Sequence, residues 1–395
     1  MRCSITKHFL KQNKKIKVLF ISSWYPNRVR PTLGNFVQKH AEAVSLYADV
    51  TVLHVCFDDN LHDKNPEILS KEINSIKTIY IYCKKSGNIL IRFCRYLNAY
   101  SKGIKMITEQ QGAPDIVHAN ILFPVGLVFC FLNTFEKIPF VITENWTGYQ
   151  PETHTKIGFV QKYFSKRIVK KASMVLPVSE DLKNAMIALG FKGNYRVLPN
   201  VVNTTLFSIV QKKNTSIKNI LHISSFVDAH KNISGILRVI KKLSEIRQDF
   251  SLHFISDGNQ EPFIVQAENM TLLNRHVFFH GEKKTDEVAK MMQQLDFLLL
   301  FSNYENLPCV IVEAYSCGLP VISTDVGGIS EHLTDKHGII IKQKDEEALL
   351  HAVNKMLDNA DTYDKKFLHE YALNNFSYES VGKKFLDVYS EILNR

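Results

Sequence analysis

The sequence predicts an α/β fold of two Rossmann-like domains, each a doubly wound parallel sheet, that face a central cleft. Short β-rich runs alternate with helix-patterned segments through the first half of the chain, and the alternation resumes in the second half. A polar stretch at 203–219 separates the two halves. Strands that alternate with helices are typical of parallel sheets. Ligands of such sheets bind beyond the carboxyl ends of the strands, so we expect the site where the halves meet.

The expected elements follow in chain order. The first half contains six candidate strands, at 17–22, 50–55, 78–83, 115–119, 140–143 and 174–179. Between the first two lies GNFVQKHAEAVSLYA, whose apolar residues recur at helical spacing. The second half contains six more candidate strands, at 220–225, 252–256, 277–280, 297–302, 320–324 and 338–342. We therefore expect an N-terminal domain over 1–205, a C-terminal domain over 206–375, and a final helix over 376–395 that packs back towards the N-terminal domain.

Composition places the chain among soluble globular proteins. With 395 residues, of which 45% are hydrophobic and 22% charged, it can bury two cores of ordinary domain size. Its seven cysteines are scattered and form no C-x-x-C pair, which argues against a disulfide framework and a structural zinc site. The basic N-terminus lacks the apolar region of a signal peptide, and the most apolar run, 121–132, is too short to span a bilayer. We expect a cytoplasmic protein.

Basic residues are concentrated in the first half. The net charge is +10, and residues 74–108 hold seven Lys or Arg and no carboxylate, interleaved with aromatic residues. A second basic segment, VQKYFSKRIVKKA, places Lys162, Lys166 and Lys170 on one helix face. These segments are either solvated helix faces or a contact for an anionic membrane surface, which would make the protein peripheral on the inner membrane face. Nucleic acid is not expected as a partner, because no recognition module accompanies the charge.

The stretch YENLPCVIVEAYSCGLPVISTDVGG at 304–328 holds two carboxylates eight positions apart, Glu305 and Glu313. It follows a buried parallel strand that is expected to end near Ser302, and Pro308 fits the first turn of the next helix. Glu305 therefore lies in a strand-to-helix loop at the ligand-binding edge. Glu313 lies inside an apolar helix, where an unpaired carboxylate is costly, so it needs donors from ligand hydroxyls or from nearby backbone N–H groups.

Two features nearby suit an anionic ligand. The amino end of the helix after Pro308 offers free N–H groups and the positive end of the helix dipole. Gly327 and Gly328 come just before a helix that is expected to start near Ser330. These glycines mark either a loop whose backbone closely approaches a ligand or a simple turn.

The stretch at 304–328 resembles the E-x7-E signature of the retaining glycosyltransferases with the GT-B fold, the large family four of nucleotide-sugar-dependent enzymes. Further segments match that family's order of elements: SSWYPNRVRPTLGNFVQKHAEAV, PDIVHANILFPVGL, VITENWTGY, PVSEDLKNAM, VFFHG and HGIIIKQKDEEALLHAV. The resemblance covers most of the chain from residue 16 onward. It implies that a sugar moves from a UDP- or GDP-linked donor, held by the C-terminal domain, to a saccharide or lipid-linked acceptor held by the N-terminal domain. It further implies retention of anomeric configuration and a place in cell-surface polysaccharide synthesis.

The resemblance also implies roles for the residues of the acidic stretch. Glu313 would hold the ribose hydroxyls of the donor. Glu305, together with the backbone of Asn306, Leu307 and Pro308, would meet the donor sugar.

Other implied roles concern the donor phosphates. Lys231 would face the diphosphate and, with Glu305, would be catalytic, because charge that develops on the departing diphosphate must be stabilised where it forms. Gly34 would let the opposite domain approach the same phosphates. Asn145 stands at a donor-binding position where the family commonly has a histidine, and residues 225–227 hold no arginine where the family commonly has one. The chain has no D-x-D motif, so no metal or other cofactor is expected.

Three other classes of function are alternatives. A GT-B sugar-nucleotide epimerase would share the donor site and would use further acid/base groups, for which His118 and Glu144 are candidates. A catalytically degenerate transferase would act as a binding partner. A dinucleotide oxidoreductase is disfavoured, because no G-x-G-x-x-G follows the first strand.

Overall fold

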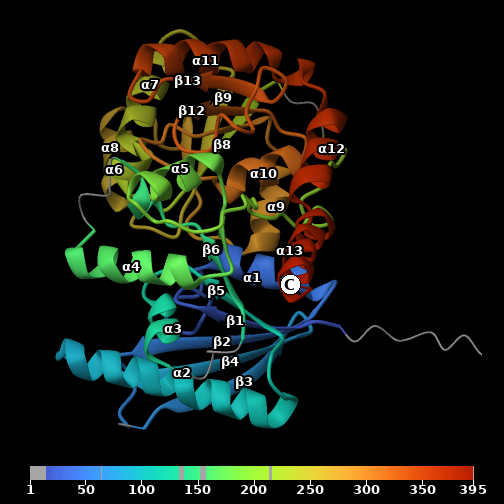
Figure 1. The fold of residues 1–395 in the computed structure, drawn as a ribbon. Helices are drawn as coiled ribbons and strands as arrows, with labels where there is room; N and C mark the ends of the chain where they lie inside the picture. The colour runs from blue at the N-terminus through green and yellow to red at the C-terminus, as the bar shows by residue number, and fades with distance from the viewer. Residues whose placement is uncertain (1–14, 64, 133–137, 152–156, 213–215, 395) are drawn as a thin grey trace, which may run out of the picture.

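The computed structural model describes residues 15–394, except residue 64 and the segments 133–137, 152–156 and 213–215. The basic N-terminal segment, which is not expected to be a signal peptide, lies before Lys15 and therefore outside the described residues. The described chain forms two α/β domains, one above the other in Figure 1. The predicted fold class is therefore confirmed.

The N-terminal domain has a sheet of seven described strands in the order β3-β4-β2-β1-β5-β6-β7. Its strands are β1 (Lys17–Ser22), β2 (Asp49–Asp58), β3 (Glu67–Ile73), β4 (Ile76–Lys84), β5 (Ile116–Asn120), β6 (Phe140–Glu144) and β7 (Met174–Pro177). Its helices are α1 (Asn35–Ser45), α2 (Ile89–Gln111), α3 (Val128–Phe131), α4 (Phe159–Lys171) and α5 (Glu180–Ala188).

The C-terminal domain has a sheet of six described strands in the order β10-β9-β8-β11-β12-β13. Its strands are β8 (Lys218–Ile223), β9 (Phe250–Ile255), β10 (Val277–Phe279), β11 (Phe297–Leu299), β12 (Val321–Thr324) and β13 (Gly338–Ile341). The helices that follow β8 are α6 (Asp228–Lys231), α7 (Ile233–Ser244), α8 (Glu261–Asn269), α9 (Thr285–Met292), α10 (Cys309–Ser316), α11 (Glu346–Asn359), α12 (Lys365–Phe376) and α13 (Tyr378–Leu393).

Strand β3 is the one departure from a parallel sheet among the described strands. It pairs antiparallel with β4, whereas the other described pairs are parallel. Asn74 and Ser75 join the two strands with φ angles of 48° and 62°, the geometry of a tight hairpin. The prediction missed β3 because its sequence, EILSKEI, is mainly polar and lies exposed at the sheet edge.

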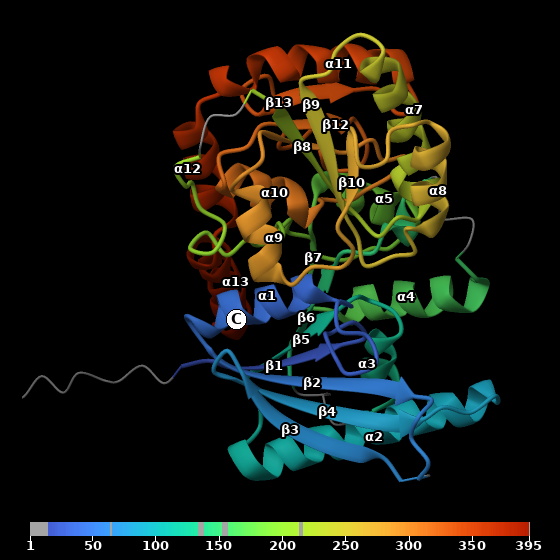
Figure 2. The ribbon, with the colours of Figure 1, turned by 180° about the vertical axis from the view of Figure 1, so that it is seen from behind.

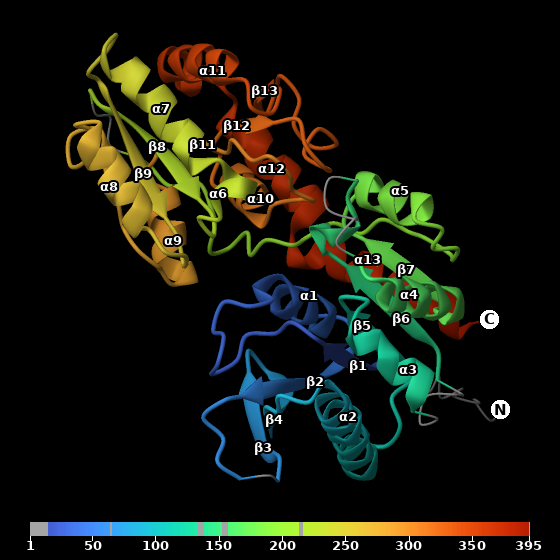
Figure 3. The same ribbon diagram turned by 90° about the vertical axis from the view of Figure 1, so that its left-hand side faces the viewer.

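The N-terminal sheet is covered on both faces. Along β1, Leu19 and Ile21 pack in the same apolar cluster as residues of α2 and α4, while Val18 and Phe20 pack in the same cluster as residues of α1 and α13. This alternation follows from the two-residue repeat of a strand. Figure 3 shows α1 on the side of the sheet that is turned toward the C-terminal domain and α2 on the other side.

The final helix, α13, lies against α1 of the N-terminal domain (Figures 1 and 2). Val381, Phe385 and Val388 of α13 are fully buried in this contact. A Cβ atom on Gly382 would lie 2.2 Å from the carbonyl oxygen of Ala43, so the close approach of the two helices requires glycine. The chain thus leaves the C-terminal domain and ends on the N-terminal one.

Three local expectations differ from the structure. The strand predicted to end near Ser302 ends at Leu299, and Pro308 is the N-cap of α10 rather than a residue of its first turn. The helix expected to start near Ser330 is instead a series of turns, which begins at the two preceding glycines. In the described part of the chain, none of the helices combines the length and apolar composition that crossing a bilayer requires.

Candidate active site

A cavity of about 830 Å³ lies between the two domains. It is lined by the loop after β1 and the start of α1 from the N-terminal domain, and by the loops after β8 and β11 and the start of α10 from the C-terminal domain. Six of the eight predicted site residues line it: Gly34, Asn145, Lys231, Glu305, Pro308 and Glu313. The cavity lies beyond the carboxyl ends of the strands, as parallel sheets favour.

Glu305 lies in the loop after β11 and faces Lys231 at the end of α6. Its Oε1 accepts hydrogen bonds from the Lys231 ammonium and from the Ser302 hydroxyl, the latter at 2.8 Å. Glu305 is only 8% exposed, so the lysine compensates a carboxylate that is largely removed from water. Its second oxygen, Oε2, has no hydrogen bond within the described residues, and it is free to accept one from a ligand.

Glu313 lies in α10 and forms an ion pair with Lys39 of α1, across the cavity. Both side chains are largely buried. Burial alone would lower the pKa of Lys39, but the facing Glu313 carboxylate, together with Cys309 and Glu42, holds this pKa above its ordinary value. The hydrogen-bond donor to Glu313 is therefore a lysine of the opposite domain. The expected alternative, donation by nearby backbone N–H groups, is wrong.

Gly34 is the N-cap of α1 and has a φ angle of +74°. A Cβ atom at this position would lie 2.5 Å from the carbonyl carbon of Trp24, so only glycine fits. The first turn of α1 holds no acidic residue, and Asn35 and Phe36 line the cavity beside Lys39. This helix end therefore presents positive potential to the cavity.

Asn306 and Leu307 lie behind the cavity wall and tie the Glu305 loop to the N-terminal domain. The Asn306 side chain donates to the Asn145 carbonyl at 2.5 Å and accepts from the Gln150 amide at 2.9 Å. The Leu307 carbonyl accepts from the Asn200 amide at 2.7 Å. These two predicted residues fix the loop rather than line the cavity.

Asn145 and Gly327 shape the same loop from two sides. The side-chain amide nitrogen of Asn145 is buried, lines the cavity region, and has no hydrogen-bond partner among the described residues. It is therefore a donor that a ligand can satisfy.

A Cβ atom on Gly327, whose φ is +59°, would lie 2.0 Å from the Glu305 carbonyl oxygen. The loop can therefore occupy its position only if residue 327 is glycine.

The acid/base candidates for an epimerase do not line the cavity. Glu144 is fully buried and accepts backbone N–H groups of Leu122, Asn145 and Trp146 at 2.8–2.9 Å. Burial raises its pKa to about 7, although these hydrogen bonds oppose the shift. His118 is also fully buried, between the Tyr389 and Thr143 hydroxyls at 2.6 Å each. Both side chains support the fold.

The family of the chain follows from comparison with known proteins. Residues 41–206 match the family described as glycosyltransferase family 4, and residues 207–372 match the family described as glycosyl transferases group 1. The chain is a GT-B glycosyltransferase. A putative teichuronic acid biosynthesis glycosyltransferase of Bacillus subtilis, TuaC, is 24% identical over 94% of this chain and 95% of that protein.

Solved structures share the fold of this glycosyltransferase. Sucrose-phosphate synthase from Thermosynechococcus elongatus superposes with a TM-score of 0.77 at 17% identity, over 96% of this chain and 99% of the other. Anabaena HepE in complex with UDP superposes with a TM-score of 0.73 at 15% identity, over 95% and 100% of the two chains. At such low identity the likeness shows the architecture alone.

Lys39 of the glycosyltransferase was not among the predicted site residues. A signal was present, because Lys39 follows Phe36 by one helical turn and both line the cavity. Its role could not be predicted, because its partner Glu313 is 274 positions away and only the folded chain brings them together. Arg30, Asp257 and Lys283 also line the cavity and were not predicted.

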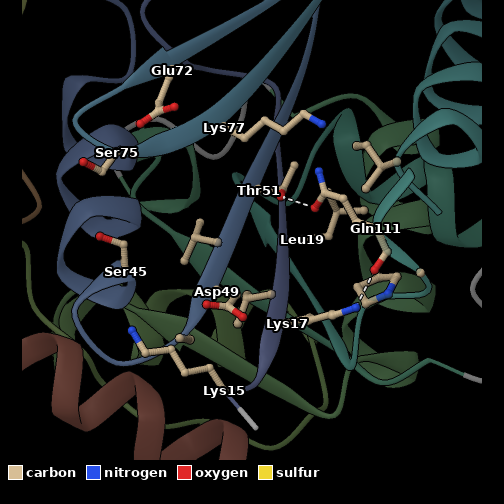
Figure 4. Close-up of a pocket in the computed structure, with 16 residues that line it drawn as sticks. Lys15, Lys17, Leu19, Ser45, Asp49, Thr51, Glu72, Ser75, Lys77 and Gln111 are labelled. Carbon is tan, nitrogen blue, oxygen red and sulfur yellow. Dashed lines mark hydrogen bonds between the residues drawn. The ribbon is translucent and has the colours of Figure 1, made fainter. Parts of the chain in front are cut away.

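A second concavity, of about 630 Å³, lies at the opposite edge of the N-terminal sheet, where β1 and β2 begin (Figure 4). There Thr51 donates to the Gln111 side chain at 2.9 Å, and Lys17 donates to the Gln111 carbonyl. Parallel sheets bind ligands at the other end of their strands, so this concavity is not the candidate active site.

Within the described ranges, no three His, Cys, Asp or Glu side chains gather as a metal site would require. A mechanism without a metal stays a prediction.

Proposed function

We propose that this glycosyltransferase moves a hexosyl group from a UDP- or GDP-linked sugar to a saccharide or lipid-linked acceptor, with retention of anomeric configuration, in cell-surface polysaccharide synthesis. One observation carries the proposal: Glu305 and Glu313 face the same interdomain cavity, and each is paired with a lysine that a bound diphosphate can attract away. The UDP in the HepE complex and the assignment of TuaC to teichuronic acid biosynthesis support the choice of donor and pathway class.

The charge of the cavity suits a nucleotide diphosphate. Among the described residues that line it, the basic side chains outnumber the acidic ones by one: Arg30, Lys39, Lys231 and Lys283 against Asp257, Glu305 and Glu313. When a donor binds, its phosphates compete for the lysines, and its hydroxyls replace them as donors to the carboxylates. After the exchange the lysines are paired with phosphate oxygens, and the carboxylates keep hydrogen bonds, now from the ligand hydroxyls.

In this pose Glu313 accepts hydrogen bonds from the ribose hydroxyls, and Glu305 accepts them from the sugar. The acceptor oxygen bonds to the anomeric carbon as the bond from that carbon to the phosphate oxygen breaks. The acceptor proton passes to the departing diphosphate, whose growing negative charge faces Lys231 and the amino end of α1. Asn145 offers its amide N–H to a sugar hydroxyl or a phosphate oxygen, without the charge that a histidine could carry.

A screen of UDP- and GDP-sugars tests the proposal. We expect one nucleotide class to raise the thermal unfolding temperature, since a ligand that binds the native state stabilises it by mass action. Transfer to an acceptor and the anomeric configuration of the product then follow from NMR of the product linkage. Donor binding without transfer to a broad acceptor panel would favour a degenerate binding protein instead.

Peripheral membrane contact is a further part of the proposal. Helix α4 exposes Phe159 and Tyr163 by 86% and 49%, beside the basic residues Lys162 and Lys166. Aromatic and basic side chains on one helix suit an anionic bilayer surface. Cosedimentation with anionic vesicles but not with neutral vesicles is expected, and equal cosedimentation with both would refute it.

A further inference from the structure

A mainly apolar pocket of about 580 Å³ lies beside the interdomain cavity, within the N-terminal domain. It is walled by the loop after β1, the ends of β2, the start of α2 and the loop after β5. Trp24, Phe57, Phe93 and Phe123 contribute aromatic surface. We call it the Trp24 pocket. It lies at the same carboxyl edge of the sheet as the active-site cavity.

The Trp24 pocket shares a wall with the active-site cavity. Trp24, Arg30 and Leu33 line both. A molecule held in the pocket can therefore place one end next to the position proposed for the donor sugar. An acceptor needs this placement, because its hydroxyl must meet the anomeric carbon.

Cations are present in the Trp24 pocket together with the apolar surface. Arg30, Lys85 and Arg92 line it, and Lys85 is paired with Asp59 at 2.9 Å. Arg30 and Arg92 have no acidic partner in the part of the chain that the structure describes. Guanidinium groups bind phosphate oxygens in a bidentate manner, so two unpaired arginines beside apolar walls favour an amphiphile with a phosphate.

Apolar side chains continue from the Trp24 pocket to the protein surface. Ile89 lines the pocket and is 70% exposed, and the next residue, Leu90, is equally exposed. Phe93 of the pocket contacts Phe131, whose ring in turn contacts Phe164 of α4, with ring centroids 5.2 and 5.5 Å apart. A chain too long for the pocket would therefore leave it over apolar surface, toward the exposed face of α4.

We propose that the Trp24 pocket binds the acceptor as a lipid phosphate: the apolar chain lies against the aromatic walls, Arg30 and Arg92 bind the phosphate, and the headgroup faces the active-site cavity across the shared wall. The inference rests on the proposed transferase function and narrows its acceptor to a lipid-linked one. An apolar peptide segment would not use the two arginines, and a free saccharide would not use the aromatic walls.

Binding of farnesyl phosphate, kept below its aggregation concentration, tests the inference. Calorimetry should detect binding to the wild-type protein, and farnesol and inorganic phosphate should each bind at least about 10-fold more weakly, because each lacks one half of the amphiphile. The variant Arg92→Glu should weaken farnesyl phosphate binding at least about 10-fold. Lys102→Glu is the matched control, because Lys102 is exposed on the same helix and lies outside the pocket; it should leave binding unchanged.

The outcomes separate this inference from the proposed function. UDP binding without farnesyl phosphate binding overturns the lipid-phosphate pocket and leaves the transferase function in place. Farnesyl phosphate binding without any nucleotide binding supports the pocket and counts against the transferase function. Three results would overturn the inference: farnesol binding as tightly as farnesyl phosphate, Lys102→Glu losing as much affinity as Arg92→Glu, or binding to anionic vesicles alone. Each would show apolar contact or general charge attraction without a site formed by the arginines.

Discussion

Lys39 of α1 and Glu313 of α10 form an ion pair that joins the two domains across the active-site cavity. Each residue compensates the charge of the other while the donor site is empty. A bound donor would take both partners, its hydroxyls binding the carboxylate and its phosphates attracting the ammonium. In the proposed function, donor binding would therefore exchange this interdomain ion pair for contacts with the ligand.

The Lys39–Glu313 pair gives a stability prediction. Glu313→Gln should lower the free energy of unfolding by about 3 kcal/mol, because it leaves the Lys39 ammonium largely buried without its counter-ion. The double variant Lys39→Met/Glu313→Gln should recover most of this loss, because it removes the uncompensated charge. Chemical denaturation measures both. A double variant that is less stable than Glu313→Gln would contradict the coupling.

Glu305 gives a prediction on catalysis. Glu305→Gln keeps the shape of the side chain and removes the charge that faces Lys231 and the donor sugar, so kcat should fall about 100-fold or more. The fold should remain, as circular dichroism can verify. Glu282→Gln, in an exposed loop of the same domain, is the control and should retain wild-type kcat. Wild-type turnover by Glu305→Gln would remove Glu305 from the active site.

Gly327 tests the position of the Glu305 loop. Gly327→Ala places a Cβ atom 2.0 Å from the Glu305 carbonyl oxygen, so it should lower kcat together with the free energy of unfolding, the latter by about 2–4 kcal/mol. Gly281→Ala is a matched control, because Gly281 also has a positive φ, +70°, but open space around its Cβ position. It should cost about 1 kcal/mol of backbone strain and leave kcat unchanged. Equal effects of the two substitutions on kcat and on the free energy of unfolding would show that the clash does not displace the Glu305 loop.

His222 gives a prediction on pH. Burial lowers its pKa from 6.5 to about 3, while its ring nitrogens are hydrogen-bonded to the Leu299 carbonyl and the Ser224 hydroxyl, both at 2.8 Å. In the unfolded chain the His222 imidazole binds a proton more readily than in the folded protein. The stability that neutral His222 contributes is therefore complete above pH 6.5. It is lost as the pH falls toward 3, by about 1.4 kcal/mol per pH unit within that window. His222→Gln should flatten the acid limb of the stability curve, and a matched substitution at exposed His351 should not. An unchanged acid limb in His222→Gln would contradict the assignment.

Much of the fold could be predicted because its strands are apolar and parallel. Twelve of the described strands overlap the predicted ones, and each is buried enough to leave an apolar run in the sequence. Strand β3 could not be predicted, because an exposed edge strand has a polar sequence and depends on its partner β4. The turns at 327–332 could not be predicted either, because glycines before an amphipathic run are equally compatible with a helix start.

The candidate site was predicted where its residues are close in sequence, or where the family resemblance implied them, as it did for Gly34, Asn145 and Lys231. Glu305 and Glu313 belong to one loop and helix, so their spacing placed both at one sheet edge. Lys39 was not predicted, because its role depends on how the domains meet. Asn306 and Leu307 were expected to meet the donor through their backbone, and this stays a prediction. The contacts of the Asn306 side chain with Gln150 and of the Leu307 carbonyl with Asn200 of the other domain could not be predicted, because they depend on how the domains meet.

The most direct test is a calorimetric titration of UDP- and GDP-sugars into the wild-type protein and the Glu313→Gln variant, with folding of both verified. We predict that at least one donor binds the wild-type protein and that Glu313→Gln raises its Kd about 10- to 100-fold, the loss expected for hydrogen bonds to a charged group. No heat of binding with any donor, or an equal Kd for both proteins, would contradict the claim that the two-glutamate cavity binds a nucleotide-sugar.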